Sequence, residues 1–315
     1  MLHFRIIVPS DLSAEVLASL QGDRSVTNLI VMTDAAVSPS GDVLLFDVAR
    51  EGVDPLLDVL REMGVEKRGS IAVEEVNYSF SDAAEKAEKA SPGIGDDAVI
   101  WEGVEQRSGE ETRLSVSYVV LMCVATMIAG VGVLFDQPIL IVGAMVVGPD
   151  FGPVAALCVG IVRRRPRIVG SALLALVVGF GAGIAATVVS TLVLQWAGVA
   201  DDSLLTGERP NLDFIWIPDG TSWFVGALAG IAGVLSLTTT KSGGLVGVAI
   251  SVTTIPAAAN AAAAIALDVQ YEIVGSLAQL GINFVAILIG GVLTLMVQRL
   301  VRRVPAGDSL VPPRR

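Results

Sequence analysis

Residues 141–153 read IVGAMVVGPDFGP, an apolar run that contains two prolines with an aspartate between them. A proline inside a helix removes a backbone donor and clashes with the carbonyl of the preceding turn, so this run predicts a break in the helix. Carbonyl groups freed by such a break are tolerated inside a membrane only where protein buries them or where they line a watered cavity. We therefore expect a membrane span that is broken near its middle, with Asp150 facing the protein interior.

Apolar stretches recur six times in the second part of the chain, and the quoted run belongs to the second of them. Each stretch is long enough to cross about 30 Å of hydrocarbon at about 1.5 Å per residue. We expect a membrane domain over residues 114–304, followed by a tail at residues 305–315. Its six transmembrane helices are predicted at residues 116–134, 138–162, 168–196, 223–239, 244–267 and 273–297.

The composition is typical of a membrane protein, because 53% of the 315 residues are apolar and 17% are charged. Residues 1–113 hold 22 acidic and 10 basic side chains, whereas residues 114–315 hold 10 and 11, so the first part predicts an acidic, water-soluble domain. The net charge of -11 argues against a nucleic-acid partner. The single histidine and the two distant cysteines, Cys123 and Cys158, argue against a metal site. We expect no cofactor, no catalytic residues and no enzyme activity.

Residues 1–80 have the pattern of a small α+β domain. Four strand-like runs and two helical segments follow the order β-α-β-β-α-β, which predicts a ferredoxin-like fold. The strands are expected at residues 2–8, 26–32, 43–48 and 71–76, and the helices at residues 12–20 and 53–63. The domain either senses a small ligand or forms dimers, or it serves assembly without chemistry of its own.

Residues 81–113 are expected to link the two domains. A charged helical segment at residues 81–90 is followed by the helix-breaking residues Ser91, Pro92 and Gly93. Trp101, further along, either anchors the chain at the lipid headgroups or is a buried side chain in a linker.

The distribution of lysine and arginine predicts the orientation in the membrane. If the first domain is cytoplasmic, ten basic residues near the spans fall on the inner side and Arg209 alone falls on the outer side. Six spans return the chain to its starting side, so both termini are expected in the cytoplasm. The outer loops carry acidic residues instead, among them Asp136, Asp219 and Glu272, which we expect to be solvated.

Six spans also divide into two groups of three, and two such groups enter the membrane with opposite polarity, as in an inverted repeat. The segments VGAM at residues 142–145 and VGVA at residues 246–249 lie 104 residues apart. At this offset Pro153 falls beside Ala257, one residue past Pro256. Chance similarity between two helices rich in glycine and valine explains these matches nearly as well.

Polar residues near the broken span and in the fifth span are candidates for a site that binds a small solute or an ion. An ionisable side chain near the bilayer centre often marks an ion or substrate path, as Asp150 would. The fifth span, predicted to be broken as well, carries hydroxyl and amide groups around its own proline. The candidate residues are Pro149, Asp150, Gly152, Pro153, Thr253, Thr254, Pro256 and Asn260. Alternatively, Asp150 stays protonated or caps a half-helix, and the threonines and the asparagine only join helices.

The motifs MIAGVGVL at residues 127–134 and IVGAMVVGP at residues 141–149, followed by Gly152 and Pro153, resemble the family called domain of unknown function 389 (DUF389). The stretch from Gly247 to Pro256 is similar to the second signature of that family, and the resemblance covers residues 115–267. It implies a bacterial polytopic inner-membrane protein with a soluble domain before the spans, and it brings no substrate. Family members commonly have an apolar residue near the position of Asp150 and a second proline beside that of Pro256.

Together these patterns favour a transporter or channel-like permease of the bacterial plasma membrane. Its site would lie at the middle of the membrane, between broken helices two and five, and the cytoplasmic domain would assemble or regulate it. The alternative is a membrane scaffold or signalling protein that transports nothing and whose soluble domain recruits a partner. Membrane lipid and further copies of the chain are the other expected partners, because glycine-rich spans and sheet edges favour association.

Overall fold

The computed structural model describes residues 1–76, 81–90, 101–209, 211–212, 215–238 and 246–301. The chain divides into two compact units, one containing Met1–Gly103 and the other Val104–Arg299. Each unit is described by itself below.

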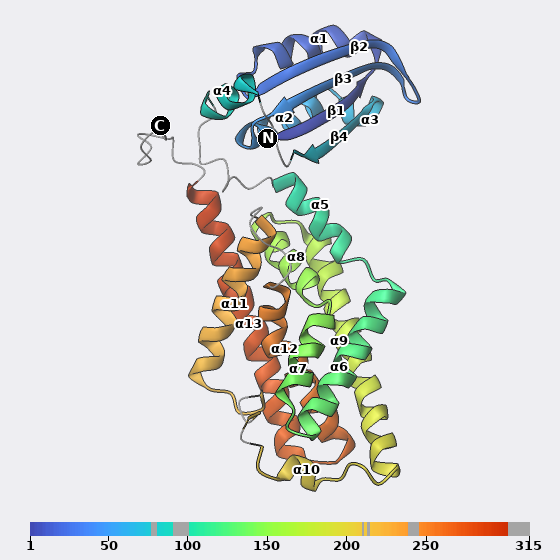
Figure 1. The fold of residues 1–315 in the computed structure, drawn as a ribbon, viewed down its shortest axis with the longest axis vertical. Coiled ribbons are helices and arrows are strands. Elements are labelled where there is room, and N and C mark those ends of the chain that lie inside the picture. Colours follow the sequence, from blue (N-terminus) through green and yellow to red (C-terminus); the bar gives the residue numbers. More distant parts are fainter. Residues whose placement is uncertain (77–80, 91–100, 210, 213–214, 239–245, 302–315) are drawn as a thin grey trace. The chain divides into compact units, whose positions relative to one another are not determined.

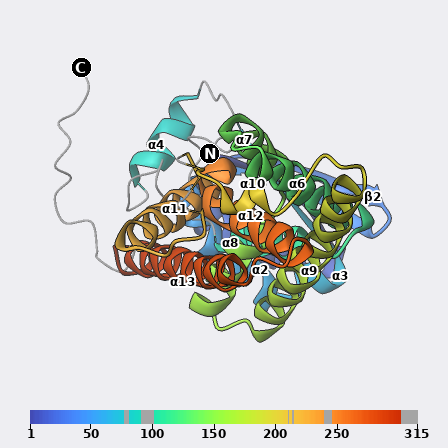
Figure 2. The same ribbon diagram turned by 90° about the horizontal axis from the view of Figure 1, so that it is seen from below.

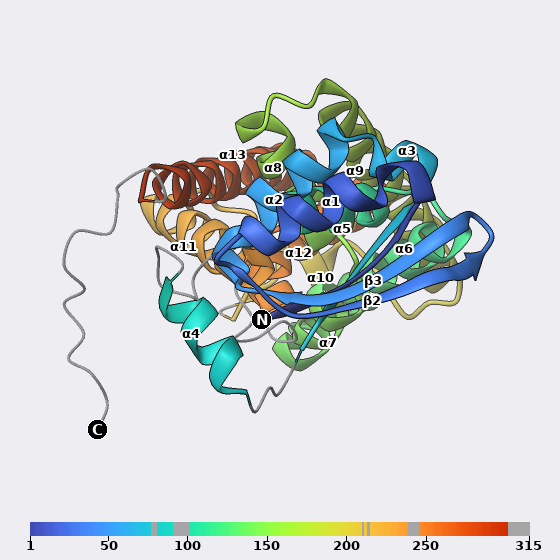
Figure 3. The ribbon, with the colours of Figure 1, turned by 90° about the horizontal axis from the view of Figure 1, so that it is seen from above.

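The N-terminal unit is built on a four-stranded antiparallel sheet with the strand order β2-β3-β1-β4. The strands are β1 (Leu2–Val8), β2 (Val26–Val37), β3 (Ser40–Val48) and β4 (Ser70–Glu75). The helices α1 (Ser10–Gly22) and α2 (Val53–Glu62) follow β1 and β3 and pack on the sheet (Figure 3). The predicted order of strands and helices is confirmed. The turn η1 (Arg50–Gly52) and the helices α3 (Val65–Arg68) and α4 (Asp82–Ala90) complete the unit.

The core of this unit is formed by side chains that alternate between buried and exposed positions along the strands. In β1 every second side chain is buried, which places Phe4 and Ile6 on the face covered by the helices. Phe4 pairs with Phe46 across the sheet, with ring centroids 5.2 Å apart. Leu20 of α1 and Leu60 of α2 close the same core. Trp101, predicted either at the lipid headgroups or buried in a linker, is 4% exposed.

The second unit is helical (Figure 1). Its helices are α5 (Trp101–Glu111), α6 (Val116–Leu134), α7 (Pro138–Val147), α8 (Phe151–Val162), α9 (Pro166–Trp196), α10 (Ser203–Thr206), α11 (Gly220–Thr238), α12 (Val246–Ala266) and α13 (Gln270–Val301). Among the described residues, the helices α6, α9, α11 and α13 are long and apolar enough to cross a membrane. The helices α7 and α8 meet at an angle of 57° and would form a fifth span as a pair.

The predicted break in the second span is confirmed, whereas the predicted break in the fifth span is wrong. Residues 246–266 form one helix, α12, which continues through Pro256. Prolines are tolerated inside such helices where neighbouring helices surround the freed backbone groups. Figure 2 shows α12 in the middle of the helical unit, and α12 contacts α6, α7, α9 and α11. Its side chains from Ile255 to Ala264 are buried without exception.

Helix boundaries recur at a spacing of 104 residues. The bounds of α6, Val116–Leu134, are followed 104 residues later by those of α11, Gly220–Thr238. The first residues of α9 and α13, Pro166 and Gln270, are separated by the same number, as are the last residues of α8 and α12. Figure 1 shows that α6 and α9 run in one direction and that α11 and α13 run in the opposite direction.

The same spacing appears in the turns and caps. Arg164, between α8 and α9, and Asp268, between α12 and α13, both have a positive φ, 54° and 57°. Ser115 accepts a hydrogen bond from the amide of Tyr118 at the start of α6, and Asp219 accepts one from the amide of Ser222 at the start of α11. Matching caps and turns therefore occur at positions 104 residues apart.

Candidate functional site

The break between α7 and α8 lies near the middle of the second apolar stretch. The helix α7 has 10 residues and is capped by Gly148, and α8 has 12 residues and begins after Asp150. Pro149 cannot continue the hydrogen-bonding pattern of α7, while Pro153 falls in the first turn of α8, where proline is tolerated. A Cβ atom on Gly148 would lie 2.0 Å from the Cδ1 atom of Ile255, so the break also lets α7 approach α12 closely.

Asp150 is fully buried at this break and is hydrogen-bonded to α12. Thr254 Oγ1 donates to Asp150 Oδ2 at 2.6 Å, and both side chains are 0% exposed. Asp150 occupies the position before α8 but makes no capping hydrogen bond to that helix. The capping role considered from the sequence is therefore not found, and the carboxyl group joins two helices instead.

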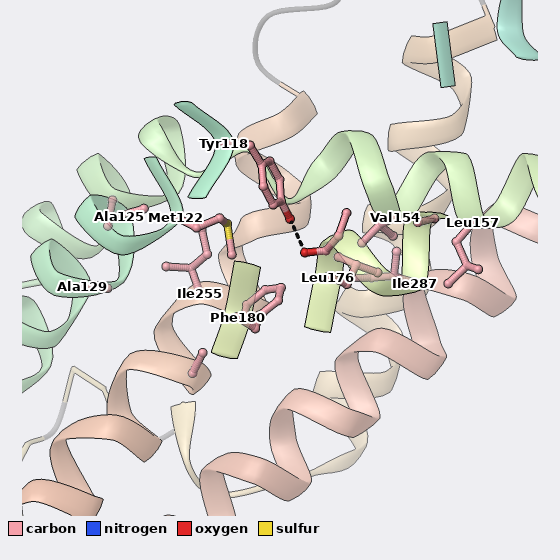
Figure 4. Packing of buried hydrophobic residues seen from close by; sticks show 14 of the residues in the cluster. Tyr118, Met122, Ala125, Ala129, Val154, Leu157, Leu176, Phe180, Ile255 and Ile287 are labelled. Atoms are coloured by element: carbon pink, nitrogen blue, oxygen red, sulfur yellow. Dashed lines mark hydrogen bonds between the residues drawn. The ribbon is translucent and has the colours of Figure 1, made fainter. Parts of the chain in front are cut away.

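A buried apolar cluster, drawn in Figure 4, includes residues that neighbour this pair on the chain. Met122, Val154 and Ile255 belong to the buried cluster of α6, α8 and α12. The hydroxyl of Tyr118 donates to the carbonyl of Ala175 at 3.0 Å and lies close enough to Asp150 to interact with it electrostatically. The carboxyl group thus has a few polar neighbours in an otherwise apolar environment.

Only part of the predicted site comes together here. Pro149, Gly152 and Pro153 flank Asp150 on the chain, and Thr254 contacts it. Pro256 lies inside α12, and the side chain of Thr253 lies outside the described residues. Asn260 is six residues beyond Thr254, about 9 Å along the helix axis, and bonds to other partners.

Those partners form a second buried polar cluster, which the sequence analysis missed. Arg209 Nη1 donates to Asn260 Oδ1 at 3.1 Å, and Arg209 Nη2 donates to Glu272 Oε1. Asn260 Nδ2 donates to Glu272 Oε2 at 2.9 Å and to Ser276 Oγ at 2.7 Å. Arg209 is 4% exposed and the three other side chains are 0% exposed. We call these four residues the Arg209 cluster.

The Arg209 cluster corrects one expectation. Glu272 was expected in a solvated loop before a span beginning at residue 273, but α13 begins at Gln270 and buries Glu272 in its first turn. Arg209, which the sequence analysis placed on the outer side, is buried as well. Each charge is buried because the other compensates it, and the hydrogen bonds of Asn260 satisfy the carboxylate further.

A polar stripe along α13 continues from this cluster. Glu272, Ser276, Gln279 and Asn283 follow the spacing i, i+4, i+7, i+11 of one helix face, and all four side chains are buried. Gln279 Nε2 donates to Ser222 Oγ of α11 at 2.8 Å. This spacing was the signal that could have revealed the cluster. The residues 104 positions earlier, on α9, are the apolar or small residues Ile168, Ala172, Ala175 and Gly179.

No group of three or more histidine, cysteine, aspartate or glutamate side chains that could hold a metal ion occurs among the described residues. Cys123 and Cys158 are free thiols. The chemistry that this arrangement offers is therefore that of buried carboxyl, hydroxyl, amide and guanidinium groups.

Residues 145–289 match the family described as Domain of unknown function (DUF389). These residues belong to the DUF389 family. The DUF389 region begins in α7 and ends in α13, and it contains Asp150, Thr254 and the whole Arg209 cluster. The resemblance seen in the sequence is thereby confirmed.

The chain is also similar to the uncharacterized protein MJ0678 of Methanocaldococcus jannaschii. The two are 24% identical over 203 residues, which are 64% of this chain and 59% of that protein. The chain thus spans about 59% of the length of this relative. No solved structure matches the chain.

Proposed function

We propose that this protein is a transporter or channel-like permease of a small solute or ion in the bacterial plasma membrane, with its central site at Asp150 and Thr254. The observation that carries the proposal is the buried Asp150 carboxyl group at a helix break, bonded to a second helix. An ionisable group near the bilayer centre costs at least about 2.5 kcal/mol on insertion scales, and such groups usually mark ion or substrate paths. The carbonyls freed at the break add oxygen ligands.

The proposal includes six spans in two inverted halves. The equal spacing of the helix bounds supports it, and so does the opposite direction of α6 and α11. Asp150 and Thr254 are themselves 104 residues apart, so they would be equivalent positions of the two halves. A contact between equivalent positions lies on the pseudo-two-fold axis that relates the halves. The central site would then lie where the two halves meet.

The polar stripe of α13 would form one side of the path. It leads from Asn283 and Gln279 to the Arg209 cluster at the beginning of α13. The matching face of α9 is apolar, so the polar path would belong to the second half alone. In this account the Arg209–Glu272 ion pair closes the path at its outer end.

The orientation proposed from the sequence is retained, with both termini in the cytoplasm and α10 on the outer side. Arg163, Arg164 and Arg165 between α8 and α9, and Arg167 in the first turn of α9, would then face the cytoplasm, as the positive-inside rule requires. The N-terminal unit, a ferredoxin-like domain in this proposal, would assemble or regulate the permease, and the protein would form homo-oligomers.

Ion and solute flux into proteoliposomes tests this function. A panel of inorganic cations, protons and small organic solutes is offered to vesicles containing the wild-type protein, Asp150→Asn, Thr254→Val or the control Thr126→Val. Thr126 is buried in α6 but bonds only to carbonyls of its own helix. We expect Asp150→Asn to lower the flux at least about tenfold, since a hydrogen bond to a charged group contributes about 1.5–3 kcal/mol. Unchanged flux in Asp150→Asn would exclude the carboxyl group from the path.

A further inference from the structure

A cavity of about 440 Å³ opens where α6 and α9 begin, and its lining includes no residue of the central site. It lies between the end of α5, the residues before α6 and the first turns of α9. Its lining consists of Gly109, Thr112, Arg113, Leu114, Arg167, Ile168, Ser171 and Leu174. The lining contains two arginines and no acidic residue, so the cavity is suited to an anion.

The two arginines of the cavity differ from their neighbours in their pairing. Arg163 and Arg165 both bond to Glu105 of α5. Within the part of the chain that the structure describes, neither Arg113 nor Arg167 forms an ion pair with an acidic side chain. Both are exposed, so their guanidinium groups are available to a ligand in the cavity.

Two hydroxyl groups lie beside the arginines. Ser171 Oγ donates to Thr112 Oγ1 at 3.2 Å, and Thr112 is buried at the end of α5. Arginine and hydroxyl groups together are the usual protein partners of phosphate oxygens. The polar end of the cavity therefore has the chemistry of a phosphate site.

The lining changes from polar to apolar along α9. Arg167, Ser171 and Leu174 follow the spacing of one helix face, and they lie progressively further into the apolar helix. Leu114 and Leu174 are 42% and 54% exposed, although both are large apolar side chains. An amphiphile with a charged head and an apolar chain matches this order better than a free ion does.

The positions 104 residues later show what fills the corresponding place in the other half. Trp216 stands at the position of Thr112, Tyr271 at that of Arg167, and Gly275 at that of Ser171. The rings of Trp216 and Tyr271 are 5.6 Å apart, and a Cβ atom on Gly275 would lie 2.3 Å from the Trp216 carbonyl oxygen. Aromatic side chains occupy this place, whereas small hydroxyl residues leave the cavity open in the first half.

We propose that this cavity binds the headgroup of an anionic phospholipid. Arg113 and Arg167 bind the phosphate together with the Ser171 hydroxyl, which turns to it from Thr112, and the acyl chains lie along Leu114 and Leu174. Basic pockets between membrane helices on the cytoplasmic side are known sites for acidic lipid headgroups. The site is separate from Asp150 and does not depend on transport.

Native mass spectrometry of the full-length protein in detergent tests the site, with phosphatidylglycerol as the probe and phosphatidylcholine as the neutral comparison. We expect Arg113→Gln with Arg167→Gln to weaken phosphatidylglycerol binding roughly 10- to 30-fold, because each arginine near a charged headgroup contributes about fivefold. Arg164→Gln is the matched control, since it removes an exposed arginine at the same end of α9 that does not line the cavity. We expect it to change binding less than about twofold.

Ser171→Leu fills the cavity without changing the charge and keeps the test valid if the double variant misfolds. We expect it to abolish preferential phosphatidylglycerol binding at an unchanged unfolding temperature. Equal binding of the two lipids by the wild-type protein would overturn the proposal. So would equal losses in the double variant and Arg164→Gln, or displacement of phosphatidylglycerol by millimolar inorganic phosphate, which would identify a site for the free ion.

Discussion

Arg209 and Glu272 are buried together at the start of α13, and each compensates the charge of the other. Both Nη atoms of the arginine are used, one for the carboxylate and one for Asn260. Removing one partner leaves an uncompensated charge inside the protein, whereas replacing both by apolar residues leaves none and lowers the free energy of unfolding less. The effects of the two substitutions on the free energy of unfolding are therefore expected to be strongly coupled.

The first prediction concerns this coupling. Arg209→Met should lower the free energy of unfolding by about 3–5 kcal/mol, and adding Glu272→Met should restore most of that loss. Denaturant titration of the purified protein in detergent measures both. The exposed pair of Arg68 and Asp11 provides the control, since Arg68→Met should cost less than about 1 kcal/mol. Additive losses from the two substitutions would show that the residues are not coupled.

The second prediction concerns Asp42 of β3. Hydrogen bonds from the Ser13 side chain and from the Asp34 amide hold the pKa of the Asp42 carboxyl below its ordinary value. The folded pKa is lower than the unfolded one, so this group stabilises the fold above its ordinary pKa of about 4, and the contribution is lost as the pH falls through the folded pKa.

Circular dichroism of residues 1–90, prepared as a separate domain, measures this effect. Asp42→Asn should lower the unfolding temperature at pH 7, and in the acid range the unfolding temperature of this variant should depend less on pH. Asp58 is an exposed residue of α2, and Asp58→Asn should leave the pH dependence of the unfolding temperature unchanged. If the unfolding temperature of Asp42→Asn fell as steeply with acid as that of the wild type, Asp42 would not be the group responsible.

At the scale of elements, the break between α7 and α8 depends on a close approach to α12. Gly148 has no room for a Cβ atom, because Ile255 of α12 already fills that space. Gly148→Ala should destabilise the protein by roughly 1–3 kcal/mol, as overpacking of a buried contact does. Ile255→Val, which removes the Cδ1 atom, should recover part of the loss.

Gly143 of the same helix supplies the matched control for this third prediction. A Cβ atom there meets nothing within 4 Å, so Gly143→Ala should be neutral or slightly stabilising. Thermal unfolding in detergent compares the variants. Equal effects of the two substitutions would mean that helix propensity, and not the contact with α12, determines the outcome.

The sequence predicted the elements better than their contacts. The prolines at 149 and 153 were sufficient to predict the break in the second span, because a proline acts on its own helix. Pro256 gave the wrong prediction for α12, since surrounding helices keep that helix continuous. Asp150 and Thr254 were both predicted as site residues and do meet. Arg209 and Glu272 were missed because their pairing requires a loop to fold inward, which no local pattern reveals.

At the scale of the whole molecule, the proposed permease has two inverted sets of three helices. Such an arrangement requires an even number of spans, with the α8–α9 turn and the α9–α11 loop on opposite sides. The proposed orientation follows from the arginines at the α8–α9 turn. The side of the membrane on which each loop lies can therefore be measured by labelling.

The fourth prediction is therefore a labelling pattern in intact cells. In a background with Cys123→Ala and Cys158→Ala, a cysteine replacing exposed Asp202 should react with a membrane-impermeant maleimide added outside. A cysteine replacing exposed Arg164 should react only after the membrane is permeabilised. The reverse pattern would invert the orientation, and labelling of both positions from one side would contradict the proposed number of spans.

The central claim, that Asp150 and Thr254 form a site reached by water, is tested most directly at position 254. In the same cysteine-free background, Thr254→Cys is exposed to membrane-impermeant thiol reagents from each side of oriented vesicles, with Ala258→Cys, buried one turn further along α12, as the control. The account predicts that Thr254→Cys reacts, and that it does so from both sides as the path opens alternately, while Ala258→Cys stays protected. Protection of Thr254→Cys from both sides in a folded, correctly inserted protein would contradict the account.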